Sequence, residues 1–177
     1  MKTLSDLCLL ACVFTACEQK VEEESVPVAE SVTLPMKVTY PGTPEIGNMK
    51  NVQTVMEWNK RVSSLNLDVA DLLADTVSFH MADGFEMITT RDSAVAFVRT
   101  FATEMVKIDI VYVAAIPVNV VEQGHQWVFS WTDETYTLKN GDVEQNFYHE
   151  DYRMEGGKIR EMFQYARKRS PPSTNLN

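Results

Sequence analysis

Cysteine is absent from almost the whole chain. All three cysteines of the 177-residue sequence precede residue 18: Cys8, Cys12 and Cys17. The rest of the chain therefore has no thiol nucleophile, no disulfide and no thiolate metal ligand. A chain of this length can bury the core of one domain without such cross-links.

Motifs for metals and cofactors are also missing. The three histidines lie far apart in the sequence, without the His-Glu-x-x-His spacing that binds zinc. The chain contains no Gly-x-Gly-x-x-Gly, Walker-type or Gly-x-Ser-x-Gly sequence. We therefore expect no metal ion, no nucleotide cofactor and no serine-hydrolase chemistry.

Basic residues are too few to balance the acidic ones. The chain has 16 Lys and Arg against 25 Asp and Glu, which gives a formal net charge of −9 and a pI near 4.8. Such a charge repels the phosphates of nucleic acids and the headgroups of anionic lipids. It excludes nucleic acid as a partner and favours a neutral or cationic one.

The N-terminal apolar run, residues 7–16, is too short to cross a bilayer. With Lys2 before it and small residues after it, this run predicts a signal peptide over residues 1–16. Phe14-Thr15-Ala16-Cys17 resembles the lipobox of bacterial lipoproteins, which implies that Cys17 is lipidated; a competing match ends at Cys12. We therefore expect a lipid-anchored protein of the bacterial cell envelope, at the outer membrane or the periplasmic face. The acidic run that follows resembles a surface-export signal or is an ordinary solvated tether.

The chain after the signal peptide divides into three parts. Residues 17–46 hold four of the seven prolines and no apolar periodicity, which predicts a flexible tether behind the lipidated cysteine. Residues 47–169 carry the periodic patterns of one folded domain. Residues 170–177 begin with Ser-Pro-Pro and are predicted to be a disordered tail.

Three helices are predicted at the start of the domain. Apolar residues at helical spacing indicate the first over residues 48–65, with Trp58 beside the apolar stripe. A short second helix is expected over residues 67–75. The third is expected over residues 91–105, where Thr89 has the spacing of a capping-box residue.

Strand patterns take over from Thr76. Alternation there places His80 on the face opposite Val77 and Phe79, so His80 either faces solvent or lines something polar. Long alternating runs follow, joined by short turns that include Asn140-Gly141, a typical hairpin sequence. These runs predict an antiparallel meander over residues 106–122, 126–138, 143–154 and 159–168. The resulting fold class is α+β, with helices on one face of a curved sheet and a cavity between them.

This order of elements resembles the nuclear transport factor 2-like superfamily, which includes SnoaL-like and ketosteroid isomerase-like proteins. Residues 72–80, 89–92 and 149–159 carry the resemblance, which covers residues 48–168. It implies a cone-shaped domain of three N-terminal helices packed on a strongly curved, mainly antiparallel sheet that encloses a cavity. It also implies a homodimer formed through the sheet, but no single activity.

The resemblance suggests two catalytic candidates. His80 falls where ketosteroid isomerases place their general base, and Glu150 falls near their oxyanion-binding aspartate. The tyrosine of that site aligns near Glu57 or Trp58, neither of which can replace a phenol, so steroid isomerisation is not expected. His80 can move a proton if a carboxyl group orients it; the alternative is a structural histidine at the cavity rim. Glu150 either lines the cavity with a raised pKa or pairs with an arginine outside.

Aromatic residues are the remaining candidates for ligand binding. Trp127, Phe129 and Trp131 alternate along one face of their strand and can form a wall for a flat apolar molecule. Trp58, Tyr152 and His80 complete the predicted set. The alternative for the stripe is a place in the core or in a dimer interface.

Three functions follow from these patterns. The first is an extracytoplasmic, lipid-anchored domain that binds a small, mainly apolar or neutral molecule in its cavity. The second is an acid-base enzyme of the isomerase, cyclase or dehydratase type that uses His80 with Glu150. The third is an envelope module that binds a protein partner through its sheet.

Overall fold

The computed structural model of the chain describes residues 35–36 and 42–169. The predicted signal peptide, the lipidation site at Cys17 and the C-terminal tail lie outside these residues, as does most of the predicted tether. The last part of the tether segment, Pro44–Ile46, forms strand β1 and pairs antiparallel with β4 (Met105–Val120).

One seven-stranded sheet forms the body of the domain, in the order β1-β4-β5-β6-β7-β2-β3. After β4, the long strands are β5 (His125–Leu138), β6 (Val143–Glu155) and β7 (Lys158–Lys168). Each pairs antiparallel with its neighbour in sequence, which confirms the predicted meander. The other edge holds β2 (Leu73–His80), parallel to β7, and β3 (Glu86–Thr90), antiparallel to β2.

The β5–β6 turn contains the predicted Asn140-Gly141 sequence. Gly141 has a φ of 92°, in the left-handed region that side chains disfavour. The Asn140 side-chain oxygen accepts a hydrogen bond of 2.9 Å from the Asp142 backbone N–H. A glycine and a self-bonding asparagine thus reverse the chain between the two strands.

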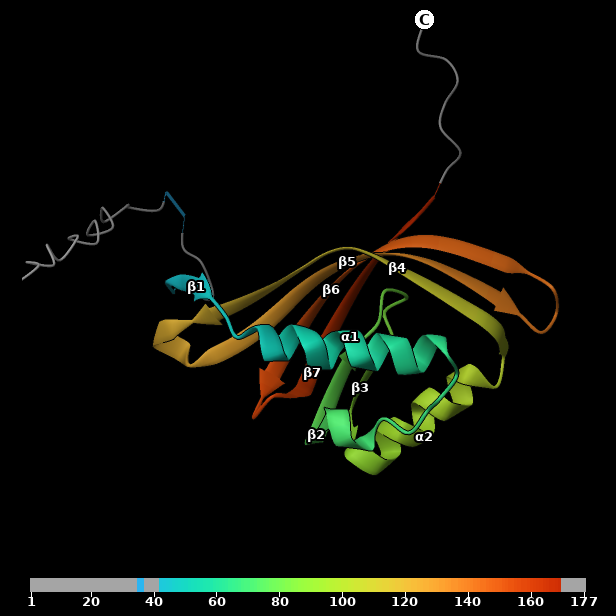
Figure 1. Cartoon of the computed structure of the whole chain (residues 1–177), viewed down its shortest axis with the longest axis horizontal. Coiled ribbons are helices and arrows are strands. Elements are labelled where there is room, and N and C mark those ends of the chain that lie inside the picture. The colour runs from blue at the N-terminus through green and yellow to red at the C-terminus, as the bar shows by residue number, and fades with distance from the viewer. Residues whose placement is uncertain (1–34, 37–41, 170–177) are drawn as a thin grey trace, which may run out of the picture. The chain divides into compact units, whose positions relative to one another are not determined.

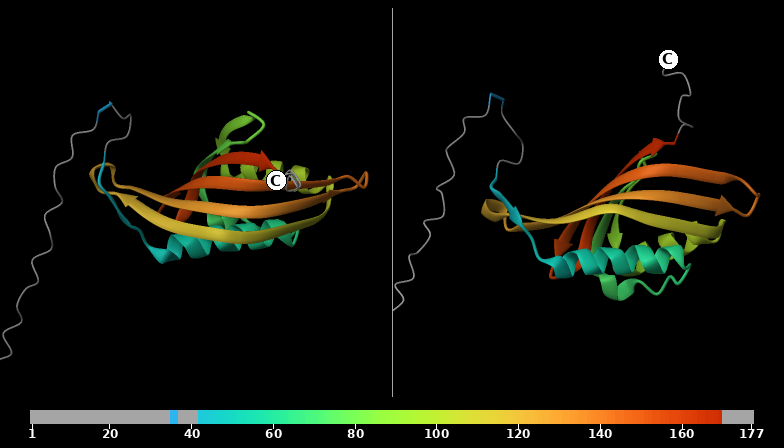
Figure 2. Two further views of the ribbon diagram at one scale, coloured as in Figure 1. Left: turned by 90° about the horizontal axis from the view of Figure 1, so that it is seen from above. Right: turned by 45° about the horizontal axis from the view of Figure 1, so that its top comes forward.

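The long strands arch over the helices, so that one face of the sheet is concave (Figures 1 and 2). Within the 16-residue β4, the register with β5 shifts between Met105 and Lys107 and again between Tyr112 and Ala114. Such irregularities bend a strand and increase its twist. The curvature provides the room for a cavity beneath the sheet.

Two α-helices cover the concave face. Helix α1 (Met49–Ser63) begins at Asn48, whose side-chain oxygen accepts from the Lys50 backbone N–H at 3.0 Å. Helix α2 (Arg91–Ala102) begins at Thr90, whose hydroxyl accepts from the Ser93 N–H, so the cap lies one residue after the predicted Thr89. Within the described residues, no helix has the length and apolarity that a membrane crossing requires.

The structure does not confirm three N-terminal helices. In place of the second one there is a single 3-10 turn at Ala70–Leu72. Leu73 is already extended and pairs with Ile159 of β7, so the strand begins before Thr76. Val69, Leu72 and Leu73 are spaced like one face of a helix because all three are buried in the same core. Two of them belong to the turn, and Leu73 begins the strand.

Strand β3 was not predicted. It has five residues, its burial alternates weakly, and Ile88 on it is 72% exposed. Its hydrogen bonds to β2 define it, and a sequence pattern does not show such pairing. It leads directly into α2, so it positions that helix over the cavity.

The two faces of the sheet have different compositions. We call the face toward the helices the inner face; on β5 it carries Ser130, Thr132 and Glu134, all buried. The opposite, outer face carries Trp127, Phe129 and Trp131, which are half-buried. The hydrophobic core lies between the inner face and the helices and includes Val55, Leu73, Val77, Phe79, Tyr152 and Ile159.

Candidate functional site

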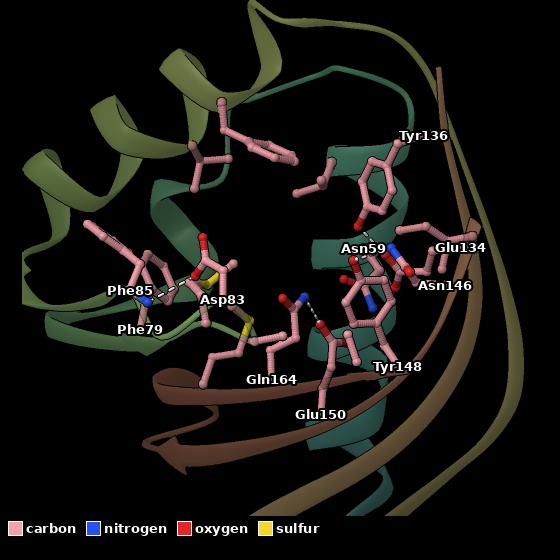
Figure 3. A pocket seen from close by; sticks show the side chains of 18 of the residues that line it. Asn59, Phe79, Asp83, Phe85, Glu134, Tyr136, Asn146, Tyr148, Glu150 and Gln164 are labelled. Carbon is pink, nitrogen blue, oxygen red and sulfur yellow. Dashed lines mark hydrogen bonds between the residues drawn. The ribbon is translucent and has the colours of Figure 1, made fainter. Parts of the chain in front are cut away.

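A cavity of about 630 Å³ lies between the inner face and the two helices (Figure 3). Both helices, strands β2, β4, β5, β6 and β7, and the loop after β2 contribute to its lining. In that loop the Asp83 carboxylate accepts from the Phe85 N–H at 2.9 Å, which holds Phe85 against the opening. A volume of this size suits a small organic molecule.

One side of the cavity is aromatic. Trp58 of α1 packs beside Phe79 of β2 with ring centroids 6.2 Å apart, and Phe79 lies 6.1 Å from Phe97 of α2. Phe85 stacks on Phe97 at 5.1 Å. Phe101 of α2 meets the ring of Tyr136 edge-on at 6.0 Å. These rings form a wall for an apolar group.

The opposite side is polar, and Glu134 on β5 is one of its two buried carboxyl groups. The Thr132 hydroxyl donates to one Glu134 oxygen at 2.7 Å, and the Tyr136 hydroxyl donates to the other. Burial, with repulsion from Glu150, raises the pKa of Glu134 to about 7. Glu134 can therefore gain or lose a proton near neutral pH.

Glu150 on β6 is the second buried carboxyl group, and its side chain is 3% exposed. Tyr152 donates to one oxygen at 2.7 Å, and the Gln164 amide donates to the other at 3.1 Å. Burial raises the pKa of Glu150, and these hydrogen bonds oppose the rise. Figure 3 shows Glu150 and Gln164 side by side on the cavity wall.

Helix α1 reaches the polar side through Asn59. Its amide donates to the Tyr112 hydroxyl at 2.7 Å, and its oxygen accepts a longer bond from Tyr152 at 3.5 Å. Burial raises the pKa of Tyr112, so its phenol stays neutral. The amide of Asn146 donates to the Tyr148 hydroxyl at 3.1 Å on the same side. The polar side thus consists of hydrogen-bonded groups around Glu134 and around Glu150, with few isolated polar side chains.

Three of the predicted site residues meet at this cavity. Trp58 and Glu150 line it. Tyr152 is fully buried behind the lining and holds Glu150. Of the two places that the sequence left open for Glu150, the structure shows the inner one, where Glu150 and Tyr152 are both buried on β6.

The other predicted site residues lie on the outer face, and their expected place in the cavity was wrong. His80 stacks on Phe163 with centroids 4.3 Å apart, and its Nδ1 lies 3.3 Å from a Glu86 oxygen. Strand alternation separates it from Phe79, which faces the cavity. His80 therefore cannot share a proton with Glu150, which faces the other way.

Trp127, Phe129 and Trp131 do not form the aromatic wall of the cavity. They alternate with Val128, Ser130 and Thr132, and those residues are the buried, inward ones on β5. Trp127 and Phe129 stack on each other on the outer face, with centroids 6.3 Å apart. The choice of face was wrong because the more apolar set was assumed to point inward.

Several site residues were missed: Glu134, Asn146, Tyr148 and Gln164. A usable signal existed for each of them. Alternation places Asn146 and Tyr148 on the face of Glu150, and the β5–β6 register opposes Glu134 to Asn146. Once Glu150 faces inward, Glu134 must do so too.

Metal binding finds no support in this cavity. Within residues 35–36 and 42–169, no three His, Cys, Asp or Glu side chains come together as a metal site would require. Every hydrogen bond described at Glu134 and Glu150 comes from a neutral group. The site is therefore an aromatic cavity with two buried carboxyl groups.

Comparison with known proteins gives a likeness of fold only. No family model matches the chain, and no curated protein matches its sequence. An LEH-like epoxide hydrolase from M. tuberculosis superposes with a TM-score of 0.57 at 8% identity, covering 67% of this chain and 84% of its own. An NTF2-like protein of unknown function from Burkholderia pseudomallei gives 0.53 at 20% identity, covering 66% and 89%. AusH from Aspergillus nidulans gives 0.54 at 13% identity, covering 71% and 89%.

Proposed function

Because residues 42–169 form a domain with the nuclear transport factor 2-like fold, we propose that the protein binds a small, mainly apolar molecule in the cavity beneath its sheet. The observation that carries this proposal is the cavity of about 630 Å³ with an aromatic wall facing a polar one. A pocket that binds small molecules typically pairs a large apolar lining with a few fixed polar groups.

The division of the lining supports one orientation of the ligand. Its apolar part packs against Trp58, Phe79 and Phe97, and its polar end lies toward Glu134 and Glu150. The network around the two carboxyl groups is already hydrogen-bonded, so the polar wall is fixed before binding. The ligand then orders few side chains when it enters.

A cavity-filling substitution tests the proposal. Val62 lines the cavity from α1, whereas Lys60 on the same helix is exposed. With 4-phenylbutan-1-ol as a neutral probe in titration calorimetry, we expect binding by the wild type and by Lys60→Trp, and at least a tenfold loss in Val62→Trp. Equal affinity in Val62→Trp would place the probe elsewhere and contradict the proposal.

Acid-base catalysis is a second candidate function, now with Glu134 in place of His80. The favouring observation is that Glu134 has a pKa of about 7 inside the cavity, close to the optimum for a general acid or base. Its partner Glu150 is also buried and has a raised pKa. Two interacting carboxyl groups can divide the acid and base roles between them.

Proton exchange on a ketone tests this second function. With 4-phenylbutan-2-one in D₂O, an acid-base site exchanges the protons next to the carbonyl faster than buffer does. We expect Glu134→Gln to reduce the enzymatic rate by about 10²-fold or more. Exchange at the buffer rate in the wild type would leave ligand binding as the function.

The N-terminal sequence supports a place for the domain in the cell. We propose that Cys17 carries the lipid that anchors the protein in the bacterial envelope, because its preceding residues resemble a lipobox. Cys17→Ser should move the expressed protein from the detergent phase to the aqueous phase, whereas Cys12→Ser should not. The reverse result would assign the lipid to Cys12.

The outer face supports a homodimer through the sheet. Beside its stripe of aromatic residues, β4 exposes Val111 and Val113 by 63% and 60%. Exposed large apolar side chains that gather on one face favour an interaction site. We infer that a second copy of the chain covers it, and sedimentation equilibrium should report twice the monomer mass.

A further inference from the structure

No cationic side chain donates a described hydrogen bond to Glu134 or Glu150, the two buried carboxyl groups of the cavity. Glu134 and Glu150 are 2% and 3% exposed, and their described hydrogen bonds come from two hydroxyl groups, one further phenol and one amide. Within the described lining, the only basic residue is Lys168, which is exposed at the end of β7. Buried carboxyl groups are ordinarily paired with a positive charge.

Glu134 and Glu150 act only as acceptors in their described hydrogen bonds. Each of the four carboxyl oxygens of Glu134 and Glu150 already accepts one hydrogen bond. An ionised carboxyl group offers about four lone-pair sites and no donor. The lone pairs that remain on these oxygens therefore suit a ligand that donates hydrogen bonds.

Resting on the proposed ligand-binding function, we propose that the ligand is an organic amine, bound as its ammonium against Glu134 and Glu150 with its apolar part among Trp58, Phe79 and Phe97. A positive charge there offsets both the burial of the carboxylates and their mutual repulsion. The ring of Tyr136, whose hydroxyl donates to Glu134, lies on the polar side of the cavity and can contact an ammonium bound there.

The charge of the whole protein agrees with a cationic ligand. A net charge of −9 raises the local concentration of cations near the domain and repels anions. Asp83 and Glu144 are exposed members of the lining, so the opening is acidic as well. The aromatic wall selects an organic cation over an inorganic one, because it provides no further ligands for a metal.

Binding of an amine should depend on pH through the two carboxyl groups. The groups that face them are Tyr112 on β4, Tyr136 on β5, and Tyr148 and Tyr152 on β6, and burial raises the pKa of all four phenols. The lining residues of α1 and α2 include no charged side chain. The remaining charges are Asp83, Glu144 and Lys168 at the edge of the cavity and His149 on the outer face of β6, which favours the ionised form of Glu150. Proton uptake by Glu134, with its pKa of about 7, therefore governs the response near neutral pH.

The test compares two probes of the same shape, 4-phenylbutylamine and 4-phenylbutan-1-ol. An alkylamine has a pKa of about 10.4 and stays protonated between pH 6 and 8, so only the protein titrates in this range. We expect the amine to bind at least tenfold more tightly than the alcohol at pH 8. Its affinity should fall about tenfold from pH 8 to pH 6, as a group with a pKa near 7 takes up a proton. The alcohol should show no such change.

Variants and proton release make the test specific. Glu134→Gln and Glu150→Gln should each reduce amine affinity about tenfold or more and reduce alcohol affinity far less, because the alcohol carries no charge. The control is Asp133→Asn, because Asp133 precedes Glu134 on β5 but pairs with Arg169 on the outer face. Should a glutamine variant fail to fold, calorimetry of the wild type at pH 6 in buffers of different ionisation enthalpy still reports whether the amine releases a proton.

The outcomes separate this inference from the function on which it rests. If Val62→Trp blocks both probes but the amine binds no tighter than the alcohol, the cavity binds ligands and the amine inference is wrong. If Ca²⁺ competes with the amine at millimolar concentration, the carboxyl groups form an inorganic cation site and the inference is also wrong. If neither probe binds, the proposed function fails, and the amine inference fails with it.

Discussion

On strand β5, the two faces of the sheet reverse the usual distribution of side chains. On β5 the inner face carries Ser130, Thr132 and Glu134, all buried, while the outer face carries Trp127, Phe129 and Trp131, all half-buried. The polar residues are enclosed and the large apolar ones are accessible. Both sets of side chains lie on the same strand. The difference between them therefore reflects their surroundings, which are the cavity on the inner side and the exterior on the outer side.

The inner face tolerates its two buried carboxyl groups because neighbouring side chains donate hydrogen bonds to them. Thr132 and Tyr136 hold Glu134, and Tyr152 and Gln164 hold Glu150. The outer aromatic residues instead cover each other, with Trp131 4.7 Å from His149 and Trp127 6.2 Å from Phe163. The inner face therefore suits the proposed ligand. The outer face presents aromatic rings that the proposed second copy would cover.

The largest expected effect is a loss of stability when an inward phenylalanine is truncated. Phe79 is 1% exposed and packs between Trp58 and Phe97, so Phe79→Ala should lower the free energy of unfolding by about 3–5 kcal/mol. Phe129→Ala on the outer face should cost about 1 kcal/mol or less in the monomer, because its surroundings can rearrange into solvent. Urea unfolding at dilute protein measures both, and equal losses would contradict the assignment of faces.

Charge on the outer face should separate the proposed dimer. Trp131→Glu places a carboxylate beside its symmetry-related copy in an apolar contact, so we expect the dissociation constant to rise about 100-fold, or about 3 kcal/mol. Sedimentation equilibrium measures this change, and far-UV circular dichroism should show an unchanged fold. A wild type that is monomeric at all concentrations would refute the dimer.

Charge on the inner face should affect stability in a pH-dependent way. In the unfolded chain Glu134 titrates near 4.5, but in the folded domain its pKa is about 7, so between these values the folded state binds more protons. The contribution of Glu134 to stability is therefore complete below about pH 4.5 and declines as pH rises to about 7. Glu134→Gln removes this decline and should stabilise the domain at pH 8 by about 2–3 kcal/mol, with little effect near pH 5. Urea unfolding of the wild type and of Glu134→Gln at both pH values measures this difference. An equal effect of the substitution at both would argue against a raised pKa of Glu134.

Most of the fold followed from local patterns. The four long strands and both α-helices were predicted because their periodicity extends over many residues, as in α2 and β6. The 3-10 turn at Ala70–Leu72 and strand β3 were not, because three or five residues carry too little periodicity. The 3-10 turn is closed by hydrogen bonds within residues 69–73, and β3 is defined by its pairing with the preceding strand β2, which its own few residues do not reveal.

The site was predicted less well than the fold. Alternation separates the two sides of a strand but does not say which side is inside, and the assumption that apolar residues point inward failed on β5. For Glu150 the sequence left two places open, in the cavity or beside an arginine outside, and the structure shows it on the inner face with Tyr152 and Met154. The same parity, applied through the β5–β6 register, would have identified Glu134 as well.

The smallest expected effect tests the residue that the sequence favoured for catalysis. His80 stacks on Phe163 and lies beside Glu86 on the outer face, so His80→Ala should change the affinity for 4-phenylbutylamine by less than about twofold. Gln164 lies on the neighbouring strand β7 and faces the cavity, so Gln164→Ala removes a donor to Glu150 and should weaken the same binding severalfold, since the carboxylate loses a hydrogen bond. Titration calorimetry of both variants at pH 8 compares them directly. If His80→Ala weakened binding and Gln164→Ala did not, the ligand would lie on the outer face, and the functions assigned to the two faces would have to be exchanged.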